Sequence, residues 1–292
     1  MNTIDINIAY NYCKNIAINH YENFPVASLL FPGDIRKYIY AVYAFARTAD
    51  DIADSPNLSS ENKIKLLDEY ESVFLNLLNK KMLSNVEKTN QIMMAVVDVI
   101  RKFNIPEFEF LNLLKAFKQD SIKNRYTEFE ELLNYSEMSA NPIGHLVLYI
   151  SGYNSDNQNE LFKLSDKICT ALQLTNFWQD VSVDLKMDRI YIPTVLMEKY
   201  YYNEEKLKNN IENNDFKNLI SFLINKTYYI FDEGKPLTNI LNKRLRREFK
   251  AIFNGGILLL KKIEQNDFRV LSQRLTLSRL DKLKIMLKVL LN

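Results

Sequence analysis

The sequence predicts an all-α fold. Apolar residues recur at spacings of three and four along almost the whole chain, which is the period of an amphipathic helix. Glycine and proline, the residues that most often break helices, number only 6 and 7 among 292 residues. Hydrophobic residues make up 47% of the chain and charged residues 25%, as expected for a protein that folds around an apolar core.

No feature of the sequence marks a domain boundary. There is no low-complexity tract, no repeat, and no linker rich in Gly, Ser or Pro. We therefore predict one domain over residues 1–292, although this length would also allow two small domains. Breakers and apolar spacing predict helices at 3–20, 32–53, 59–78, 89–103, 106–124, 129–152 with an interruption at Pro142, 157–185, 203–212, 216–231, 236–262 and 279–291.

Charge and hydropathy limit the partners and the location. A formal net charge of +2 predicts no nucleic-acid partner. We find no basic leader followed by an apolar stretch and no span of about 18 apolar residues, and expect a cytoplasmic protein. Residues 279–291 alternate apolar residues with Lys282, Lys284 and Lys288. This pattern favours core packing with a solvated lysine face, but it also allows peripheral contact with the inner membrane.

One polar stripe is predicted on the helix at 32–53. It consists of Tyr43, Arg47, Asp50, Asp51 and Asp54. At about 100° per residue these side chains share an arc of roughly 100°. The other sides of the helix are apolar enough to be buried, so the stripe faces either solvent or a group that compensates its charge. Three carboxylates this close repel one another unless a cation neutralises them.

A second polar stripe is predicted on the helix at 157–185. Gln173, Asn176, Asp180 and Asp184 share an arc of roughly 80°, and bulky apolar residues flank them. A carboxylate in such surroundings is costly without a counter-charge. A solvated acidic surface would explain either stripe alone. Two stripes in one all-helical chain favour a shared metal site.

Carboxylate oxygens are the ligands that Mg²⁺ prefers, and Mg²⁺ commonly bridges one or two carboxylates to phosphate oxygens. We therefore predict that the five aspartates hold Mg²⁺ against a diphosphate and promote its departure. Arg47, on the first stripe, and Arg189, in the loop after the second, would add charge-assisted hydrogen bonds to phosphate. The predicted chemistry is ionisation of a diphosphate ester.

The motifs resemble those of the squalene and phytoene synthase family over nearly the whole chain. They are HYENFPVASLLFP, YAFARTADDIAD, YSEMSANPIG, LQLTNFWQDVSVD with DRIYIP, and VLSQRLTLSRLDKLKI, in the family's order and at its spacing. The resemblance implies an all-α isoprenoid synthase fold with helices around a central cavity. Within the family, NFPVAS, ARTADDIAD, SANPIG and NFWQD are most similar to the hydroxysqualene synthases of bacterial hopanoid pathways.

The resemblance also implies roles for individual residues. The magnesium ligands would be Asp50, Asp51, Asp54, Asp180 and Asp184, and the residues lining the diphosphate and the reacting carbons would be Tyr43, Arg47, Gln173 and Asn176. Tyr135 matches a tyrosine whose ring lies near the carbocation in relatives, where an aromatic face attracts positive charge. His20 and Asn23 match positions near a diphosphate, and Arg274 and Lys282 match a basic pair near the C-terminus.

One residue departs from the family pattern. Relatives that join two prenyl diphosphates commonly carry Arg before the aspartate of the second motif, where this chain has Gln179. The lost positive charge fits an enzyme that takes one already joined C30 substrate. The resemblance then implies that presqualene diphosphate is ionised and captured by water to give hydroxysqualene.

Two alternatives stay open on the sequence. The first is condensation of two prenyl diphosphates to presqualene diphosphate, squalene or phytoene, where a squalene synthase would use NADPH. The chain lacks a G-x-G-x-x-G motif, which excludes only a Rossmann site for that cofactor. The second is a non-catalytic assembly factor on the same fold, which the five intact aspartates argue against. The sequence does not predict the oligomeric state.

Overall fold

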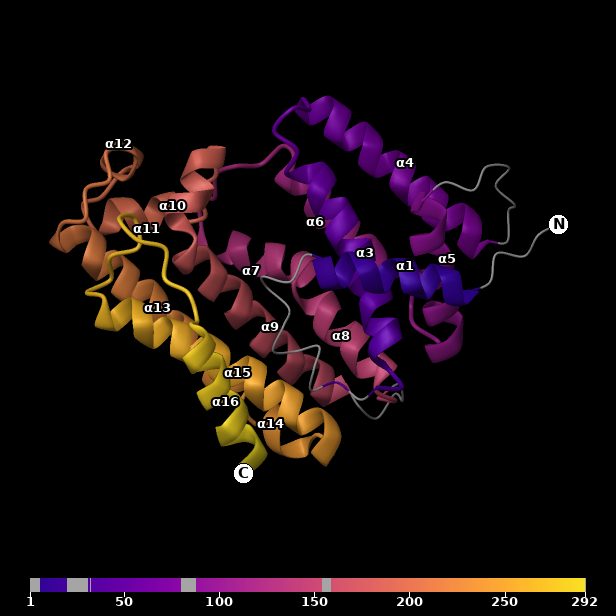
Figure 1. Cartoon of the computed structure of the whole chain (residues 1–292). Helices are drawn as coiled ribbons and strands as arrows, with labels where there is room; N and C mark the ends of the chain where they lie inside the picture. The colour runs from indigo at the N-terminus through magenta and orange to yellow at the C-terminus, as the bar shows by residue number, and fades with distance from the viewer. Residues whose placement is uncertain (1–5, 20–30, 32, 80–87, 154–158, 292) are drawn as a thin grey trace. The chain divides into compact units, whose positions relative to one another are not determined.

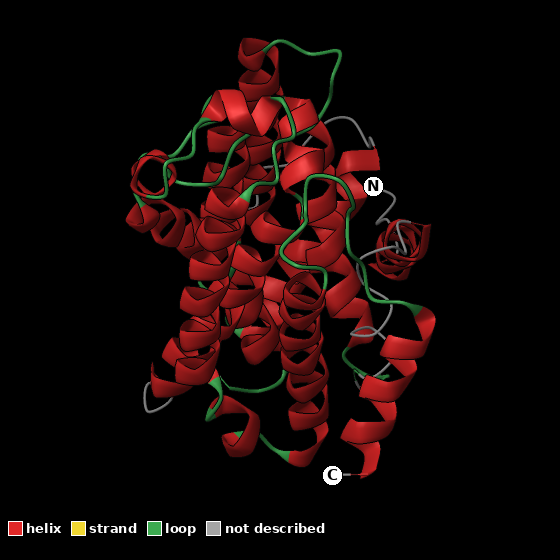
Figure 2. Ribbon diagram, turned by 90° about the vertical axis from the view of Figure 1, so that its left-hand side faces the viewer, coloured by secondary structure: helices red, strands yellow, loops and turns green. Residues whose placement is uncertain are grey.

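A computed structural model describes residues 6–19, 31, 33–79, 88–153 and 159–291. Within these ranges the chain consists of helices joined by loops and turns, with no strand (Figures 1 and 2). The one β-type contact there is an isolated bridge between Arg125 and Ile190. The all-α prediction is confirmed. No helix of the described ranges is both long and apolar enough to cross a membrane.

The chain divides into two compact units, residues 1–122 with 142–162, and residues 123–141 with 163–292. That these units form one domain stays a prediction. The helices of the first unit are α1 (Ile6–Asn19), α3 (Arg36–Ala53), α4 (Ser60–Leu78), α5 (Lys88–Phe103), α6 (Phe108–Asp120) and α8 (Asn141–Ile150, whose first residue belongs to the second unit). Helix α3 packs on α1, α4, α5 and α6, and so lies at the centre of this unit.

The buried side of α3 holds an aromatic cluster. The ring of Phe45 lies 5.2, 5.6 and 5.1 Å from those of Tyr70, Phe74 and Phe110, measured between centroids. These rings are buried, and the edge-on contacts with Phe74 and Phe110 stabilise beyond the area they remove from water. The Tyr70 hydroxyl donates to the Phe45 carbonyl oxygen at 3.2 Å. The cluster fixes which side of α3 faces the core, and thereby which side carries the first polar stripe.

The second unit contains the remaining helices. They are α7 (Phe129–Ser139), α9 (Asn159–Gln179, which begins in the first unit), α10 (Val181–Asp184), α11 (Thr194–Lys199), α12 (Glu204–Lys208), α13 (Asn214–Gly234), α14 (Leu237–Ile240), α15 (Lys243–Gln265) and α16 (Arg279–Leu291), with a 3₁₀ turn at Leu185–Met187. Trp178 on α9 is fully buried, and its Nε1 donates to the Thr227 hydroxyl of α13 at 2.8 Å. This bond satisfies the indole N–H in the core and ties α9 to α13.

Three predicted features of the second unit are wrong. The helix predicted at 157–185 is interrupted at Asp180, where the helical segments α9 and α10 meet. The helix predicted at 236–262 is two helices, because Leu241 is extended and the Asn242 side chain caps the start of α15 by accepting from the Leu245 N–H. The short helix α11 lies between the predicted helices at 157–185 and 203–212, where the sequence predicts no helix.

Gly256 on α15 allows a close approach in the second unit. A Cβ there would lie 2.5 Å from Cζ of Phe231 and 2.9 Å from Cδ2 of Leu172, closer than packed atoms tolerate. We expect Gly256→Ala to lower the free energy of unfolding by about 1–3 kcal/mol, measured by urea denaturation. The matched control is Gly255→Ala, whose added Cβ would meet Leu277 at an ordinary contact distance of 3.7 Å. It should be neutral or stabilising by up to about 1 kcal/mol, and equal losses in both variants would contradict the close approach.

Candidate functional site

The first polar stripe lies on α3 and is organised by Arg47. Its guanidinium contacts Asp50 at 3.3 Å (Nη1 to Oδ2) and Asp51 at 2.6 Å (Nη2 to Oδ1). Tyr43, Arg47 and Asp50 are half-buried, whereas Asp51 and Asp54 are exposed. The charge repulsion that the sequence implies is therefore partly offset within the stripe by an arginine that belongs to it.

The pKa values of Tyr43 and Arg47 in this stripe are both raised. Burial raises the pKa of the Tyr43 hydroxyl, as do the two neighbouring aspartates, while Arg47 acts in the opposite direction. Burial lowers the pKa of Arg47, but Asp51 and Asp50 more than offset it, so the net pKa is raised. Its Nε is buried and makes no hydrogen bond to the described part of the chain. The stripe thus presents a neutral phenol, a fixed cation and carboxylates on one face.

The second polar stripe crosses the break between α9 and α10. Asp180 has φ −100° and ψ 12°, outside the helical range. Its N–H still donates to the Asn176 carbonyl oxygen, and its own carbonyl accepts from the Asp184 N–H, each at 2.8 Å. Hydrogen bonds between residues four apart, as in an α-helix, therefore continue through the break. The distorted backbone is at Asp180, which the sequence predicts to be a metal ligand.

Asp180 is held by an arginine from the C-terminal part of the chain. Arg274 donates to both carboxylate oxygens, Nε to Oδ1 at 2.7 Å and Nη2 to Oδ2 at 3.0 Å. The neighbouring Gln179 is buried, and its Nε2 donates to the Leu275 carbonyl oxygen at 2.6 Å. Asp180 of the second stripe and the adjacent Gln179 thus anchor the segment around Arg274. The sequence places Arg274 in a basic pair near the C-terminus, and the structure pairs it with Asp180. A role for Arg274 in binding diphosphate stays a prediction.

Tyr135 lies in a cluster of four buried aromatic rings in the second unit. The rings of Phe177 and Tyr191 are stacked with centroids 3.9 Å apart, and Tyr126 stacks on Tyr191 at 5.4 Å. Tyr135 contacts all three, at 5.9 to 6.2 Å. Phe177 is three residues before Asp180, so the chain places an aromatic wall next to the second stripe. The sequence singled out Tyr135 but missed its three aromatic neighbours.

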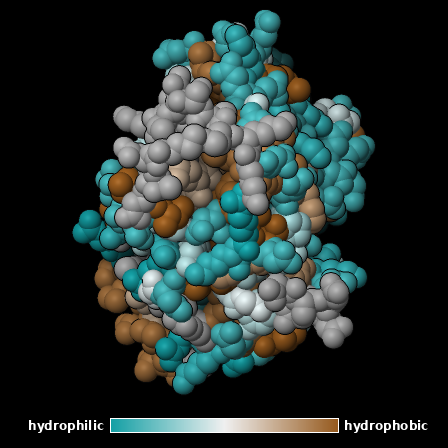
Figure 3. Space-filling model, turned by 90° about the vertical axis from the view of Figure 1, so that its right-hand side faces the viewer, coloured by the Kyte–Doolittle hydropathy of each residue, from teal (hydrophilic) through white to brown (hydrophobic). Residues whose placement is uncertain are grey.

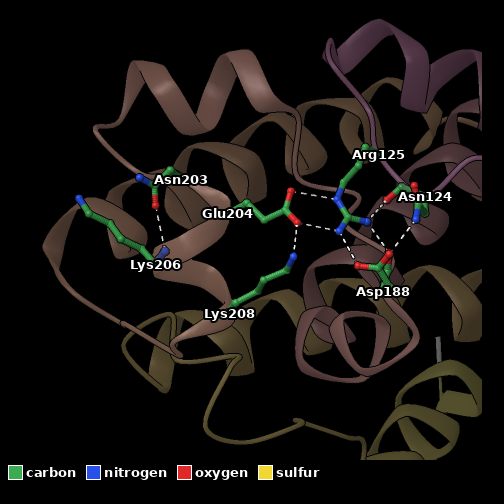
Figure 4. Close-up of polar contacts among 7 residues, drawn as sticks. All are labelled: Asn124, Arg125, Asp188, Asn203, Glu204, Lys206 and Lys208. Carbon is green, nitrogen blue, oxygen red and sulfur yellow. Dashed lines mark hydrogen bonds and ion pairs between the residues drawn. The ribbon is translucent and has the colours of Figure 1, made fainter.

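A network around Arg125 holds the loop that follows the second stripe (Figure 4). Its guanidinium contacts Glu204 through Nε and Nη2 at 3.0 and 2.7 Å, and Asp188 through Nη2 at 2.6 Å. It also donates to the Asp188 carbonyl oxygen. Asp188 has φ 57°, a left-handed conformation that is uncommon for a residue with a side chain. These contacts fix the turn next to Arg189.

The same network connects to the second polar stripe through the backbone. The Arg189 N–H donates to the Asp184 carbonyl oxygen at 2.9 Å, and the Ile190 N–H donates to the Asn124 carbonyl oxygen at 2.9 Å. Arg125 is therefore a positioning residue for Asp184 and Arg189. No local pattern in the sequence indicates it, because Glu204 is 79 residues away.

We expect Arg125→Gln to loosen this loop. Amide exchange should accelerate over residues 186–192, and kcat/KM with the substrate proposed below should fall about tenfold, because Arg189 and Asp184 lose their fixed placement. The free energy of unfolding should fall by only about 1 kcal/mol, since Arg125 and Glu204 are half-buried and water reaches the network. Hydrogen exchange followed by mass spectrometry, with steady-state kinetics, measures both effects.

The control for this variant is Lys123→Gln, which removes a nearby ion pair with Glu131 at 2.8 Å and leaves the loop contacts intact. Equal exchange in both variants would contradict the assignment. The pKa of Glu204 is lowered to about 2 by Arg125 and Lys208. A carboxyl group whose pKa is lowered by folding stabilises the folded state at every pH above its ordinary pKa. The contribution of this pair should therefore persist at neutral pH and be lost only as the pH falls from about 4.5 towards 2.

The donor set of both stripes fits Mg²⁺, which takes hard oxygen ligands. Among the described residues no three acidic, His or Cys side chains converge into a closed coordination cluster. Each stripe instead offers one or two carboxylates beside a guanidinium. That arrangement suits a cation that completes its shell with water and phosphate oxygens, and an arginine that binds the same phosphate.

The other predicted site residues differ in what the structure shows of them. His20 and Asn23 lie outside the described residues. Gln173 is half-buried on α9 and Asn176 is exposed on it, on the face that leads to Asp180. Lys282 lies in the first turn of α16 and is half-buried. The two stripes belong to different units, so a single site shared between them stays a prediction.

Comparisons with known proteins all point to the same family. Residues 18–281 match the family model described as squalene/phytoene synthase. A hydroxysqualene synthase of Zymomonas mobilis is 34% identical over 178 residues, which cover 61% of this chain and 56% of that relative's length. A hydroxysqualene synthase of Rhodopseudomonas palustris is 29% identical, covering 89% and 85%. A 15-cis-phytoene synthase of Synechocystis is 24% identical, covering 91% and 80%.

Solved structures agree with this result. The squalene synthase HpnC from Alicyclobacillus acidocaldarius superposes with a TM-score of 0.82 at 31% identity, covering 90% of this chain and 96% of that one. A dehydrosqualene synthase in complex with a ligand superposes with a TM-score of 0.84 at 20% identity, covering 97% and 96%. The predicted isoprenoid synthase fold is confirmed. The chain belongs to the squalene/phytoene synthase family.

Proposed function

We propose that the protein is a hydroxysqualene synthase that ionises presqualene diphosphate. The observation that carries the proposal is the set of groups around Asp180. This carboxylate is held by Arg274, and the aromatic cluster of Tyr126, Tyr135, Phe177 and Tyr191 begins three residues away. Asp180, suited to a diphosphate site, and Phe177, an aromatic face of the cluster suited to a carbocation, therefore lie three residues apart.

The proposed reaction breaks the carbon–oxygen bond to the diphosphate. The bonding electron pair leaves with the diphosphate, the cyclopropylcarbinyl cation rearranges, and the oxygen of water bonds to the resulting cation and loses a proton. Mg²⁺, when bound by the aspartates of the two stripes, neutralises charge on the departing diphosphate. The two stripes act together in this proposal, as one ionisation site.

The side chains of this protein supply the remaining functions. Arg47, Arg189 and Arg274 bind phosphate oxygens, since a guanidinium presents paired donors to an oxyanion. The amides of Gln173 and Asn176 orient the substrate from the face of α9. His20, Asn23 and Lys282 are further diphosphate contacts in this proposal, by their match to family motifs.

Tyr135, by the same match, directs its ring towards the carbocation. Its three buried neighbours hold that ring in place and exclude water from the apolar side, which protects the cation from early capture. Tyr43 stays protonated because its pKa is raised, so its hydroxyl donates a hydrogen bond without adding negative charge to the diphosphate site.

The choice of one C30 substrate is supported by two observations. The hydroxysqualene synthase of Rhodopseudomonas palustris matches 89% of this chain at 29% identity, against 24% for the phytoene synthase of Synechocystis. Gln179 is neutral and buried against the Leu275 carbonyl, so this position supplies no positive charge for a second diphosphate. The competing proposal is condensation of two prenyl diphosphates, which the similarity to phytoene synthases favours.

Purified protein, Mg²⁺ and presqualene diphosphate should give hydroxysqualene and inorganic diphosphate without NADPH, identified by mass spectrometry. Parallel reactions with farnesyl or geranylgeranyl diphosphate, each with and without NADPH, test the alternative. Products from these substrates alone would replace the proposal with condensation. No turnover of any prenyl diphosphate, together with a stable protein complex, would instead support an assembly factor.

A further inference from the structure

The C-terminal helix α16 exposes a stripe of leucines. Leu280, Leu283, Leu287, Leu290 and Leu291 are exposed by 68%, 52%, 50%, 47% and 83%. At about 100° per residue they fall within an arc of roughly 100°. Ile285 and Val289, on the opposite side of the helix, are buried where α16 packs on α15. Core packing, which the sequence favoured for this helix, therefore accounts for one face only.

Exposed apolar residues are not in themselves a docking surface, since hydrophobic side chains occur among hydrophilic ones on the face shown in Figure 3. The leucine stripe differs because of its continuity and its charge. Lys284 and Lys288 border one edge of the stripe, Arg279 borders the other, and all three are exposed.

The charge of α16 is one-sided. The helix carries four basic residues, of which Lys282 lies away from the stripe, and a single acid, Asp281. That acid is ion-paired with Lys262 of α15 at 2.6 Å. Its charge is therefore neutralised within the protein, and the exposed side of α16 is apolar along its middle and cationic along its edges.

We propose that the leucine stripe of α16 docks the protein onto the surface of an anionic lipid bilayer. Leucines enter the interface between headgroups and acyl chains, and the basic side chains extend their stems along the apolar surface and place their charges among the headgroups. This surface follows from exposure and charge and does not depend on the reaction proposed above.

A second copy of the chain fits this surface poorly. A two-fold interface through α16 would bring the stripe and its basic borders against the same residues of the partner, and like charges oppose such pairing. Five partly exposed leucines make a small patch beside the roughly 800 Å² per partner of a standard interface. An anionic bilayer meets both the apolar middle and the cationic edges.

Docking has a consequence for the candidate site. Arg274 precedes the first residue of α16 by five positions and is paired with Asp180 of the second stripe. The carbonyl of the next residue, Leu275, accepts a hydrogen bond from Gln179. A bilayer that binds α16 would therefore contact a helix that begins five residues after Arg274, one of the proposed diphosphate-binding residues. A long hydrocarbon substrate dissolved in the same bilayer would be delivered near them.

Sedimentation with sucrose-loaded vesicles tests the surface, using phosphatidylglycerol mixed with phosphatidylcholine and phosphatidylcholine alone. Wild-type protein should pellet with the anionic vesicles, and less so at high salt. The variant Leu283→Ser/Leu287→Ser/Leu291→Ser should lower the partition coefficient about tenfold or more. Lys284→Gln/Lys288→Gln should lower it roughly tenfold on anionic vesicles only.

The matched control is Val195→Ser/Ile211→Ser/Ile240→Ser, which removes three exposed aliphatic side chains from other segments and should bind as wild type. Circular dichroism and the Tm confirm folding of each variant. The proposal is overturned if wild-type protein does not pellet with anionic vesicles or if the leucine variant pellets as much as wild type. It is equally overturned if the bound fraction is the same on anionic and on phosphatidylcholine vesicles. It is also overturned if wild type is a dimer that the leucine substitutions dissociate. Turnover of detergent-dispersed substrate, measured separately, reports on the reaction alone.

Discussion

Asp180→Asn is expected to reduce Mg²⁺-dependent turnover of presqualene diphosphate by about a thousandfold or more. The substitution keeps the shape of the side chain but removes the charged oxygen that a metal requires. Loss of several kcal/mol of stabilisation of the departing diphosphate corresponds to a factor of this size. Steady-state assays and calorimetric titration with Mg²⁺ and inorganic diphosphate should show turnover and metal binding lost together.

Folding should survive this change. Arg274 loses its charged partner, but its side chain is 43% exposed and water can solvate it, so the free energy of unfolding should change by less than about 1 kcal/mol. Glu160→Gln, an exposed acid in the first turn of α9, is the matched control and should leave both measurements unchanged. Retained turnover in Asp180→Asn would remove Asp180 from the metal site.

Arg47→Gln should have two effects of opposite sign. The affinity of the metal-free protein for Mg²⁺ should rise several-fold, because the guanidinium that now neutralises Asp50 and Asp51 no longer competes with the metal. Turnover should fall about a hundredfold, because the substrate diphosphate loses a charge-assisted contact. Calorimetry and kinetics on the same preparations separate the two effects.

The control for Arg47→Gln is Lys37→Gln, which removes a cation from the opposite end of the same helix, where it lies 4.9 Å from the ring centroid of Tyr10. It should change neither quantity. Arg47→Lys should recover part of the turnover, since it restores charge without the paired donors of a guanidinium. A fall in both metal affinity and turnover would show that Arg47 organises the aspartates and does not compete for them.

The sequence predicts those helices best whose ends carry local signals. Helix α4 begins as predicted, because the Ser59 hydroxyl accepts from the Asn62 N–H as an N-cap. Helix α16 matches its predicted range. The breaks at Asp180 and Leu241 involve no glycine or proline. Apolar spacing alone therefore predicts a continuous helix across each of them. Helix α11 has six residues, too few for the spacing to repeat.

The candidate site divides in the same way. Each stripe could be predicted because its residues are neighbours on one helix, and helical geometry places them on one face. The residues that hold the second stripe and its following loop could not be predicted from local pattern, because they are distant in sequence. Arg274 is 94 residues from Asp180, and Arg125 is 63 residues from Asp188. Such contacts depend on tertiary packing. Only the family resemblance pointed to Arg274, and nothing pointed to Arg125.

The most direct test is a crystal structure with Mn²⁺ in place of Mg²⁺ and a non-hydrolysable analogue of presqualene diphosphate. Anomalous scattering locates the metal independently of the coordinates. We predict metal peaks within ligand distance of carboxylates from both stripes, bridged by the diphosphate, with Arg47 and Arg274 turned towards phosphate oxygens. A diphosphate bound with no metal at either stripe, and Arg274 still paired with Asp180, would contradict a shared ionisation site.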